Sequence, residues 1–173
     1  MDSILPYIEH QRIEDRCDEI VRTLGIREDC NVIFIEQGSR RFALALVSKM
    51  RHEAILVPVR IHTYAGTSPA CAPVLGDGDR AKLGRVDYRK PTILVDDICD
   101  TGRTLCYLQS LLPDTVITVV LLDKPDNHTC AVRLDHAGFE VPGNMFFVGY
   151  GMDFNEYYRD LDYVGILPRR SRA

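Results

Sequence analysis

The sequence predicts an α/β fold with a parallel sheet that is covered by helices on both faces. Short runs that are almost entirely apolar alternate along the chain with segments of helical periodicity. Strands without a polar face are typical of parallel sheets buried between helices. With 173 residues and no internal repeat or dividing linker, the chain fits one domain, 1–173, that can bury a substantial core.

The first third of the chain is expected to alternate between helix and strand. Apolar side chains at helical spacing predict helices, and short β-branched runs bounded by loops predict buried strands. In chain order, these elements are expected over 9–24 (helix), 31–35 (strand), 42–50 (helix) and 54–59 (strand).

Residues 60–90 interrupt this alternation. Prolines and glycines break the segment repeatedly, and it keeps no sustained periodicity. Irregular stretches of this length within a compact domain are commonly mobile lids or binding loops. We therefore expect a flexible loop with a role at the active site, and a disordered insertion is the alternative.

Regular structure is expected to resume at 91–95, a strand bounded by proline. A helix then begins near Gly102 and carries a row of leucines, and 116–122 is a further apolar strand. The final third, from Ala131 onward, has shorter segments, of which 146–148 is the clearest. We expect this last part to cap one end of the sheet.

Composition and charge argue against several classes of function. Hydrophobic residues make up 46% and charged residues 27% of the chain, the balance of a globular protein. The net charge of -4 provides no general basic field for nucleic acid, and the basic 169–172 segment is expected to be a solvated tail. No uncharged apolar stretch approaches about 18 residues, so we expect no membrane partner either.

The cysteines show neither a CxxC pair nor a spacing typical of metal sites. They are Cys17, Cys30, Cys71, Cys99, Cys106 and Cys130. The N-terminus lacks the basic and apolar regions of a signal peptide. We therefore expect free thiols and a cytoplasmic location.

One segment combines carboxylates with the features of a phosphate site. The strand at 93–95 is expected to deliver Asp96 and Asp97 at its carboxyl end, where open α/β sheets bind ligands. The turn at 100–104 then enters a helix and offers backbone N–H groups, two hydroxyls and the positive end of a helix dipole. Gly102 lets the backbone approach the anion closely, because no side chain intervenes.

Carboxylates beside a phosphate cradle would repel the anion that the cradle attracts. The conflict disappears if the carboxylates hold the neutral hydroxyls of a ribose that carries the phosphate. The sequence therefore favours a sugar phosphate as the ligand. Two structural alternatives remain, in which Thr101 and Thr104 only cap the helix, and Asp96 and Asp97 form a strand-end Mg²⁺ site or are solvated.

The segment Val95–Thr104 resembles the binding motif for 5-phosphoribosyl 1-diphosphate (PRPP) of the type I phosphoribosyltransferases. Asp123–Pro125 and 138–161 are similar to the C-terminal region of the hypoxanthine-guanine members of that family. The resemblance implies a parallel sheet flanked by helices, with a small hood made of C-terminal and N-terminal segments. In that arrangement 124–173 would mainly form the base-binding hood.

The activity that the resemblance implies is Mg²⁺-dependent transfer of the 5-phosphoribosyl group from PRPP to N9 of hypoxanthine or guanine, giving IMP or GMP and pyrophosphate. Xanthine is a further possible 6-oxopurine. By the family pattern, Asp96 and Asp97 would hold the ribose hydroxyls directly or through Mg²⁺. Asp100 would act as a general base toward the purine N7, an effect worth about 10²–10⁴-fold in rate. The residues expected around PRPP are Asp96, Asp97, Cys99, Asp100, Thr101, Gly102, Arg103, Thr104, Gln37, Gly38 and Arg159.

A second set of residues is expected to contact the purine. Lys124 would donate to the 6-oxo group, and it would find no acceptor on the 6-amino group of adenine. Phe146 would stack on the ring, and Phe147 would offer its backbone to the base edge. Asp153 would meet a second Mg²⁺ or the purine 2-substituent, so the implied metal ligands are Asp96, Asp97 and Asp153.

Two segments depart from the family pattern. The pyrophosphate loop, usually leucine-lysine-glycine-glycine, reads Glu36-Gln37-Gly38-Ser39 here and places a carboxylate near a polyanion. Arg40 and Arg41 follow, and we hypothesise that they restore the positive charge. In the lid, the family's serine-tyrosine pair is matched by Thr63-Tyr64. Closure of that lid would exclude water from the reaction.

Two other functions were weighed. A regulatory protein of the same fold would bind PRPP without turnover, but the presence of Asp100, Lys124, Asp153 and Arg159 argues against it. An enzyme for another base, such as adenine, orotate or uracil, is disfavoured by Lys124 and by the 146–153 segment. Because the family forms dimers and tetramers, we also expect a homo-oligomer.

Overall fold

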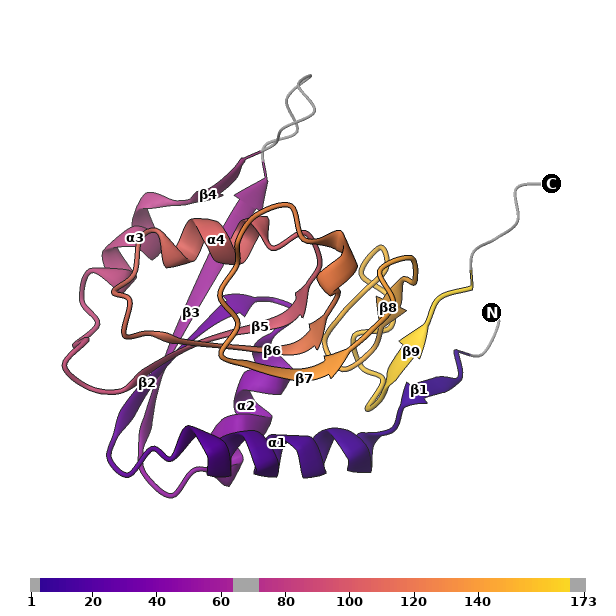
Figure 1. Ribbon diagram of the computed structural model, residues 1–173, viewed down its shortest axis with the longest axis horizontal. Coiled ribbons are helices and arrows are strands. Elements are labelled where there is room, and N and C mark those ends of the chain that lie inside the picture. The colour runs from indigo at the N-terminus through magenta and orange to yellow at the C-terminus, as the bar shows by residue number, and fades with distance from the viewer. Residues whose placement is uncertain (1–3, 64–71, 169–173) are drawn as a thin grey trace.

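The central sheet carries the predicted parallel core (Figure 1). The computed structural model describes residues 4–63 and 72–168, and within them this sheet has the strand order β4-β3-β2-β5-β6-β7. Strands β3, β2, β5, β6 and β7 run parallel, and the edge strand β4 pairs antiparallel with β3. The strands are β2 (Cys30–Glu36), β3 (Ala54–Thr63), β4 (Pro73–Leu75), β5 (Thr92–Cys99), β6 (Ile117–Asp123) and β7 (His136–Glu140).

Helices cover both faces of this sheet, as the all-apolar strands predicted (Figure 1). Helices α1 (His10–Leu24) and α2 (Arg40–Lys49) bury residues such as Ile13 and Phe42 in one hydrophobic cluster. Helices α3 (Asp77–Leu83) and α4 (Arg103–Gln109) contribute to a second cluster with the opposite side chains of the central strands. Because successive side chains of a strand point to opposite faces of the sheet, each central strand contributes to two separate hydrophobic cores.

A small second sheet lies beyond one end of the central sheet (Figure 1). It joins β1 (Pro6–Ile8), β9 (Val164–Ile166) and β8 (Phe147–Val148) in antiparallel pairs, in the order β1-β9-β8. The Tyr163 hydroxyl donates to the Ile4 carbonyl and so joins the segment before β9 to the segment before β1. The expected hood of C-terminal and N-terminal segments is therefore confirmed.

The expectation of irregular structure over 60–90 is wrong for much of that segment. Strand β3 continues to Thr63, whose backbone is in register with Pro73 of β4, and α3 follows. A seven-residue helix with one fully buried side chain, Leu83, has too few apolar positions to show periodicity. Tyr64 lies outside the described residues, as does the Thr63 side chain, so the predicted lid pair is not placed.

Strand β7 was also not expected. Everything after Ala131 was expected in the cap, but β7 extends the central sheet beside β6, with Leu122 opposite Phe139. Only one of its five residues is fully buried, so it lacks the apolar run that identified β5 and β6. Among the described residues, no helix combines the length and the apolarity that crossing a membrane requires.

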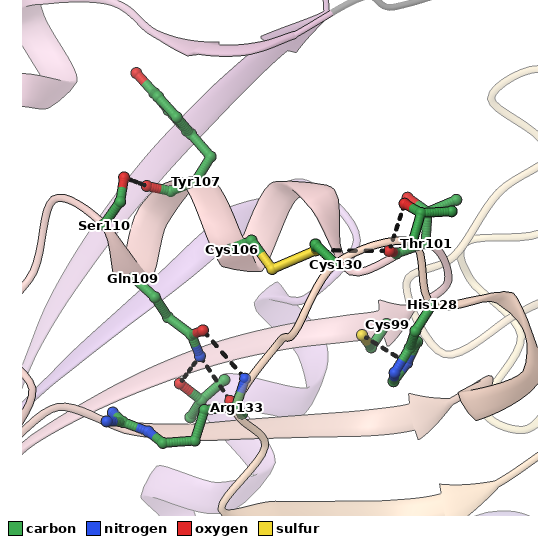
Figure 2. The surroundings of a disulfide bond; sticks show 11 residues. Cys99, Thr101, Cys106, Tyr107, Gln109, Ser110, His128, Cys130 and Arg133 are labelled. Atoms are coloured by element: carbon green, nitrogen blue, oxygen red, sulfur yellow. Dashed lines mark hydrogen bonds between the residues drawn. A yellow bond between two sulfur atoms is a disulfide. The ribbon is translucent and has the colours of Figure 1, made fainter.

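The expectation of free thiols holds for only part of the chain. Cys106 of α4 and Cys130 form a disulfide, whereas Cys17, Cys30 and Cys99 are free and buried. Cys71 lies outside the described residues. Nothing in the cysteine spacing indicated this pair, because the two sulfurs meet only where the segment after β6 folds back over α4 (Figure 2).

Candidate active site

Two neighbouring carboxylates lie in the last part of β5. The Asp97 N–H donates to Asp96 Oδ1 at 3.0 Å, and the Ile98 N–H donates to Asp97 Oδ1 at 3.0 Å. Burial raises the pKa of Asp96 well above its usual value, and the charge of Asp97 adds to this effect. Burial also raises the pKa of Asp97, against the opposing charge of Arg159. A cation or a set of ligand hydroxyls would compensate this pair.

The loop after β2 passes directly beside this acid pair. A Cβ atom added at Gly38 would lie 2.7 Å from Asp97 Cγ, far inside ordinary contact. A Cβ atom at Gly151, whose φ is 101°, would in turn collide with the Gly38 carbonyl. A side chain at Gly151 would meet backbone, and one at Gly38 would displace the Asp97 carboxylate, so the predicted pyrophosphate loop, the acid pair and the C-terminal segment meet here.

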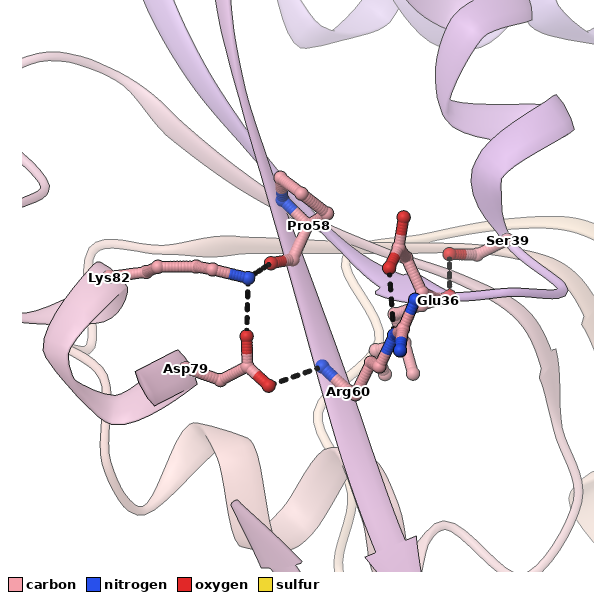
Figure 3. Close-up of polar contacts among 7 residues, drawn as sticks. Glu36, Ser39, Pro58, Arg60, Asp79 and Lys82 are labelled. Carbon is pink, nitrogen blue, oxygen red and sulfur yellow. Dashed lines mark hydrogen bonds and ion pairs between the residues drawn. The ribbon is translucent and has the colours of Figure 1, made fainter. Parts of the chain in front are cut away.

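The carboxylate of Glu36 is balanced by a residue that the sequence analysis missed. Arg60 Nε donates to Glu36 Oε2 at 3.1 Å, and the Arg60 N–H donates to Asp79 (Figure 3). Asp79 in turn accepts from Lys82, which also donates to the Pro58 carbonyl. The register places Glu36 opposite Arg60 on parallel strands β2 and β3, and register was not visible in the sequence.

Arg41 is engaged in the hood instead. Its guanidinium lies 4.7 Å from the Tyr150 ring centroid, and Nη1 donates to the Leu161 carbonyl at 2.8 Å. Of the two arginines expected to restore positive charge near the ligand, Arg41 is thus occupied by other contacts, and Arg40 is exposed. The hypothesis therefore depends mainly on Arg40.

The predicted phosphate loop joins β5 to α4. Gly102 has a φ of 77° and immediately precedes the helix, while Thr101 is exposed. The Thr101 carbonyl accepts from the Thr129 N–H at 3.0 Å, so a hydrogen bond from the segment after β6 holds the loop in place. Arg103 and Thr104 are partly buried in the first turn of α4. Cys99 is 1% exposed, and its side chain contacts His128 rather than the loop surface, so only its backbone could serve PRPP.

Lys124 and Asp100, expected to act separately on the purine, form an ion pair. Lys124 Nζ lies 3.1 Å from Asp100 Oδ2, and the two residues follow the neighbouring parallel strands β6 and β5. The lysine side chain is 6% exposed and the aspartate side chain is 49% exposed, so the carboxylate faces the site. Asn127, which sequence reasoning missed, donates to Asp100 Oδ1 at 2.6 Å and to the Gly143 carbonyl at 3.0 Å.

The two phenylalanines of the hood differ in exposure. Phe146 is 47% exposed and meets Phe154 edge-to-face at 5.6 Å between ring centroids. Phe147 is buried against Tyr7, and its ring centroid lies 5.7 Å from Lys124 Nζ. This arrangement leaves Phe146 accessible for stacking, as expected, and restricts Phe147 to backbone contact with a ligand.

Arg159 holds residues of the C-terminal segment together near the Asp96–Asp97 pair. Its Nη2 lies 2.8 Å from Asp153 Oδ1, and its Nη1 donates to the Gly151 carbonyl at 2.9 Å. Glu156 adds a weaker ion pair at 3.2 Å. The buried Nε has no hydrogen-bond partner within residues 4–63 and 72–168. A buried donor without a partner is costly, and an oxygen of an anionic ligand would satisfy it.

Comparisons with known proteins agree with this geometry. Residues 8–155 match the phosphoribosyl transferase domain family. The hypoxanthine-guanine phosphoribosyltransferase of Lactococcus lactis is 37% identical over 141 residues, which cover 79% of this chain and 74% of that protein. The bifunctional protein TilS/HprT of Listeria innocua is 46% identical over 167 residues, which cover 89% of this chain and 25% of that longer protein.

Among solved structures, a hypoxanthine-guanine phosphoribosyltransferase of Bacillus anthracis superposes with a TM-score of 0.81 at 24% identity, over 96% of this chain and 100% of that chain. This likeness establishes the fold. Because the family match spans most of the sequence and the Lactococcus enzyme matches over most of its own length, this chain belongs to the phosphoribosyl transferase family and is similar to its hypoxanthine-guanine members.

Proposed function

We propose that this protein transfers the 5-phosphoribosyl group of PRPP to N9 of hypoxanthine or guanine, giving IMP or GMP and pyrophosphate. The observation that carries the proposal is the Lys124–Asp100 ion pair beside the phosphate loop. In the reaction, the bond from N9 to C1′ of the ribose forms while the bond from C1′ to the pyrophosphate oxygen breaks. Asp100 accepts the purine proton and releases it to water.

Lys124 supports the choice of a 6-oxopurine. Its buried ammonium would donate to the purine O6, and adenine would leave one of its protons without an acceptor. Asp100 accepts from both Lys124 and Asn127, which hold the carboxylate in place between substrate and solvent. Phe146 would cover one face of the base.

The acid pair fits the Mg²⁺ that the family implies. Asp96 and Asp97 supply the hard carboxylate oxygens that Mg²⁺ prefers. Burial raises the pKa of both carboxyl groups, and a bound cation would stabilise their ionised forms. When bound, Mg²⁺ would neutralise charge on the pyrophosphate leaving group. Asp153 is already paired with Arg159 at 2.8 Å, so we assign the metal to the acid pair first.

The test is nucleotide formation from PRPP and Mg²⁺ with hypoxanthine, guanine, xanthine and adenine. We expect turnover of 6-oxopurines and not of adenine. In Lys124→Met, which keeps an unbranched side chain but removes the ammonium group, the preference for a 6-oxo over a 6-amino group should fall by about 10- to 100-fold. PRPP binding without turnover of any base would favour the regulatory alternative.

The remaining assignments stay predictions. These are the lid role of 60–90, the base-binding role of 124–173 and a cytoplasmic location. We also propose a homo-oligomer, supported by the exposed apolar side chains Ile55 and Leu56 on β3 and Leu44 on α2. Light scattering coupled to size-exclusion chromatography would measure a dimer or tetramer, and a monomer at assay concentrations would contradict it.

A further inference from the structure

Three side chains of metal-ligand type converge beneath the phosphate loop. Cys99 Sγ lies 3.3 Å from His128 Nε2, which lies 2.8 Å from Asp123 Oδ1. The three ligand atoms all lie within 4.8 Å of one another. Figure 2 shows the thiol and the imidazole pointing toward each other, away from the neighbouring disulfide. Cys99 and Asp123 are buried at adjacent strand ends, and they face each other in the register of β5 and β6.

Protons satisfy this cluster poorly. Cys99 and Asp123 both contact the same ring nitrogen of His128. With Nε2–H donating to Asp123, the Cys99 thiol has only a weak S–H hydrogen bond to that same carboxylate. The shared nitrogen also argues against a nucleophilic cysteine triad, in which thiol and carboxylate occupy opposite ring nitrogens. A cation, in contrast, accepts a lone pair from all three atoms at once.

We propose that Cys99, Asp123 and His128 form a binding site for Zn²⁺ or a similarly soft divalent cation, distinct from the Mg²⁺ site. One sulfur, one imidazole nitrogen and one carboxylate oxygen are the ligand types of zinc sites with three protein ligands and a fourth, open position. Binding would displace the Cys99 thiol proton to solvent.

Such a cation would link segments that the proposed reaction uses. Cys99 directly precedes Asp100, and Asp123 directly precedes Lys124, whose backbone N–H already donates to the Cys99 carbonyl at 2.9 Å. His128 belongs to the segment after the short 3₁₀ helix η1 (Pro125–Asn127). The cation would therefore fix the ends of β5 and β6 to each other below the site.

Co²⁺ titration of the chelator-treated, disulfide-intact protein tests this proposal independently of turnover. Thiolate ligation of Co²⁺ produces a near-ultraviolet charge-transfer band that carboxylates alone do not give. Co²⁺ bound to the Asp96–Asp97 pair therefore does not contribute to this band. We expect one equivalent to saturate the band and Zn²⁺ to displace it. Cys99→Ser should abolish the band, and His128→Gln should weaken Co²⁺ binding by about 100-fold or more.

Cys17→Ala is the matched control, because Cys17 is also a free, fully buried cysteine but lies on α1. It should retain the wild-type band. If Cys99→Ser does not fold by near-ultraviolet circular dichroism, His128→Gln decides alone, since that side chain is 21% exposed and is not part of the core. Absence of a band in the wild type, or a band unchanged in the folded Cys99 and His128 variants, would overturn the proposal.

Discussion

Replacement of Gly38 by alanine tests how the pyrophosphate loop and the acid pair fit together. The new Cβ would lie 2.7 Å from Asp97 Cγ, whereas carbon atoms in contact stay about 3.5–4.0 Å apart. The two groups must therefore separate by about 1 Å. The loop cannot move away from Asp97 easily, because the Gly38 carbonyl already lies close to Gly151, where a Cβ atom would collide with it.

The carboxylate of Asp97 is the group free to move. Its rotation would break the hydrogen bond from the Ile98 N–H, a loss of about 1 kcal/mol, which lowers Tm by about 2–4 °C in a chain of this size. A displacement of 1 Å at a reacting centre costs up to about 100-fold in rate. We therefore expect Gly38→Ala to lower kcat/KM for PRPP by about 100-fold while the fold persists.

Initial rates of IMP formation against PRPP concentration, at saturating hypoxanthine and Mg²⁺, measure this effect. Gly78→Ala is the control, because an added Cβ there has nothing within 4 Å. That change lies inside α3 and should raise stability by up to about 1 kcal/mol without changing PRPP kinetics. A Gly38→Ala variant with wild-type kcat/KM for PRPP would show that the loop does not serve that substrate.

Three further predictions concern charge and the disulfide. Because burial raises the pKa of Asp96 in the folded state, the fold loses stability as pH rises from the ordinary value of 3.8 to that raised pKa. Asp96→Asn should therefore have a higher Tm than the wild type near pH 8, and the difference should vanish below 3.8; equal melting curves at both pH values would contradict this. The Cys106–Cys130 disulfide closes a loop with a sequence separation of 24, so reduction should cost about 3.5 kcal/mol and about 10 °C in Tm, and an unchanged Tm in dithiothreitol would refute it. Arg60→Ala leaves Glu36 unpaired and should raise the KM for PRPP, and Glu36→Gln in the same chain should restore it; failure of this rescue would remove the charge argument.

The apolar runs predicted most of the central sheet because burial on both faces dictates them. The motif around Asp96 and Asp97 likewise predicted where these acids lie, at the end of a buried strand just before the turn into a helix. Parallel strand ends meet at one edge of the sheet, which accounts for the encounter of Asp100 with Lys124. Both residues were predicted as site residues, but the ion pair between them was not.

Features that depend on register or on long-range folding were not predictable. The pairing of Glu36 with Arg60 requires the alignment of β2 with β3, and the disulfide requires the return of a segment after β6. Helix α3 is short and mostly exposed, and β7 is short with a single fully buried residue, so their hydrophobic patterns are too weak to identify. The cluster of Cys99, Asp123 and His128 was not predicted either, because its members come from three separate segments that meet only in the fold.

The role of Asp100 as the proton acceptor is the central claim of the proposed mechanism. Asp100→Asn keeps the size of the side chain and a hydrogen bond to Lys124 but removes the basic group. A comparison of kcat for IMP formation with the Kd for PRPP, measured on the same preparation by calorimetry, separates proton transfer from binding. We predict that kcat falls by about 10²–10⁴-fold while the Kd stays unchanged. Undiminished turnover, or loss of PRPP binding in proportion to turnover, would contradict the assignment.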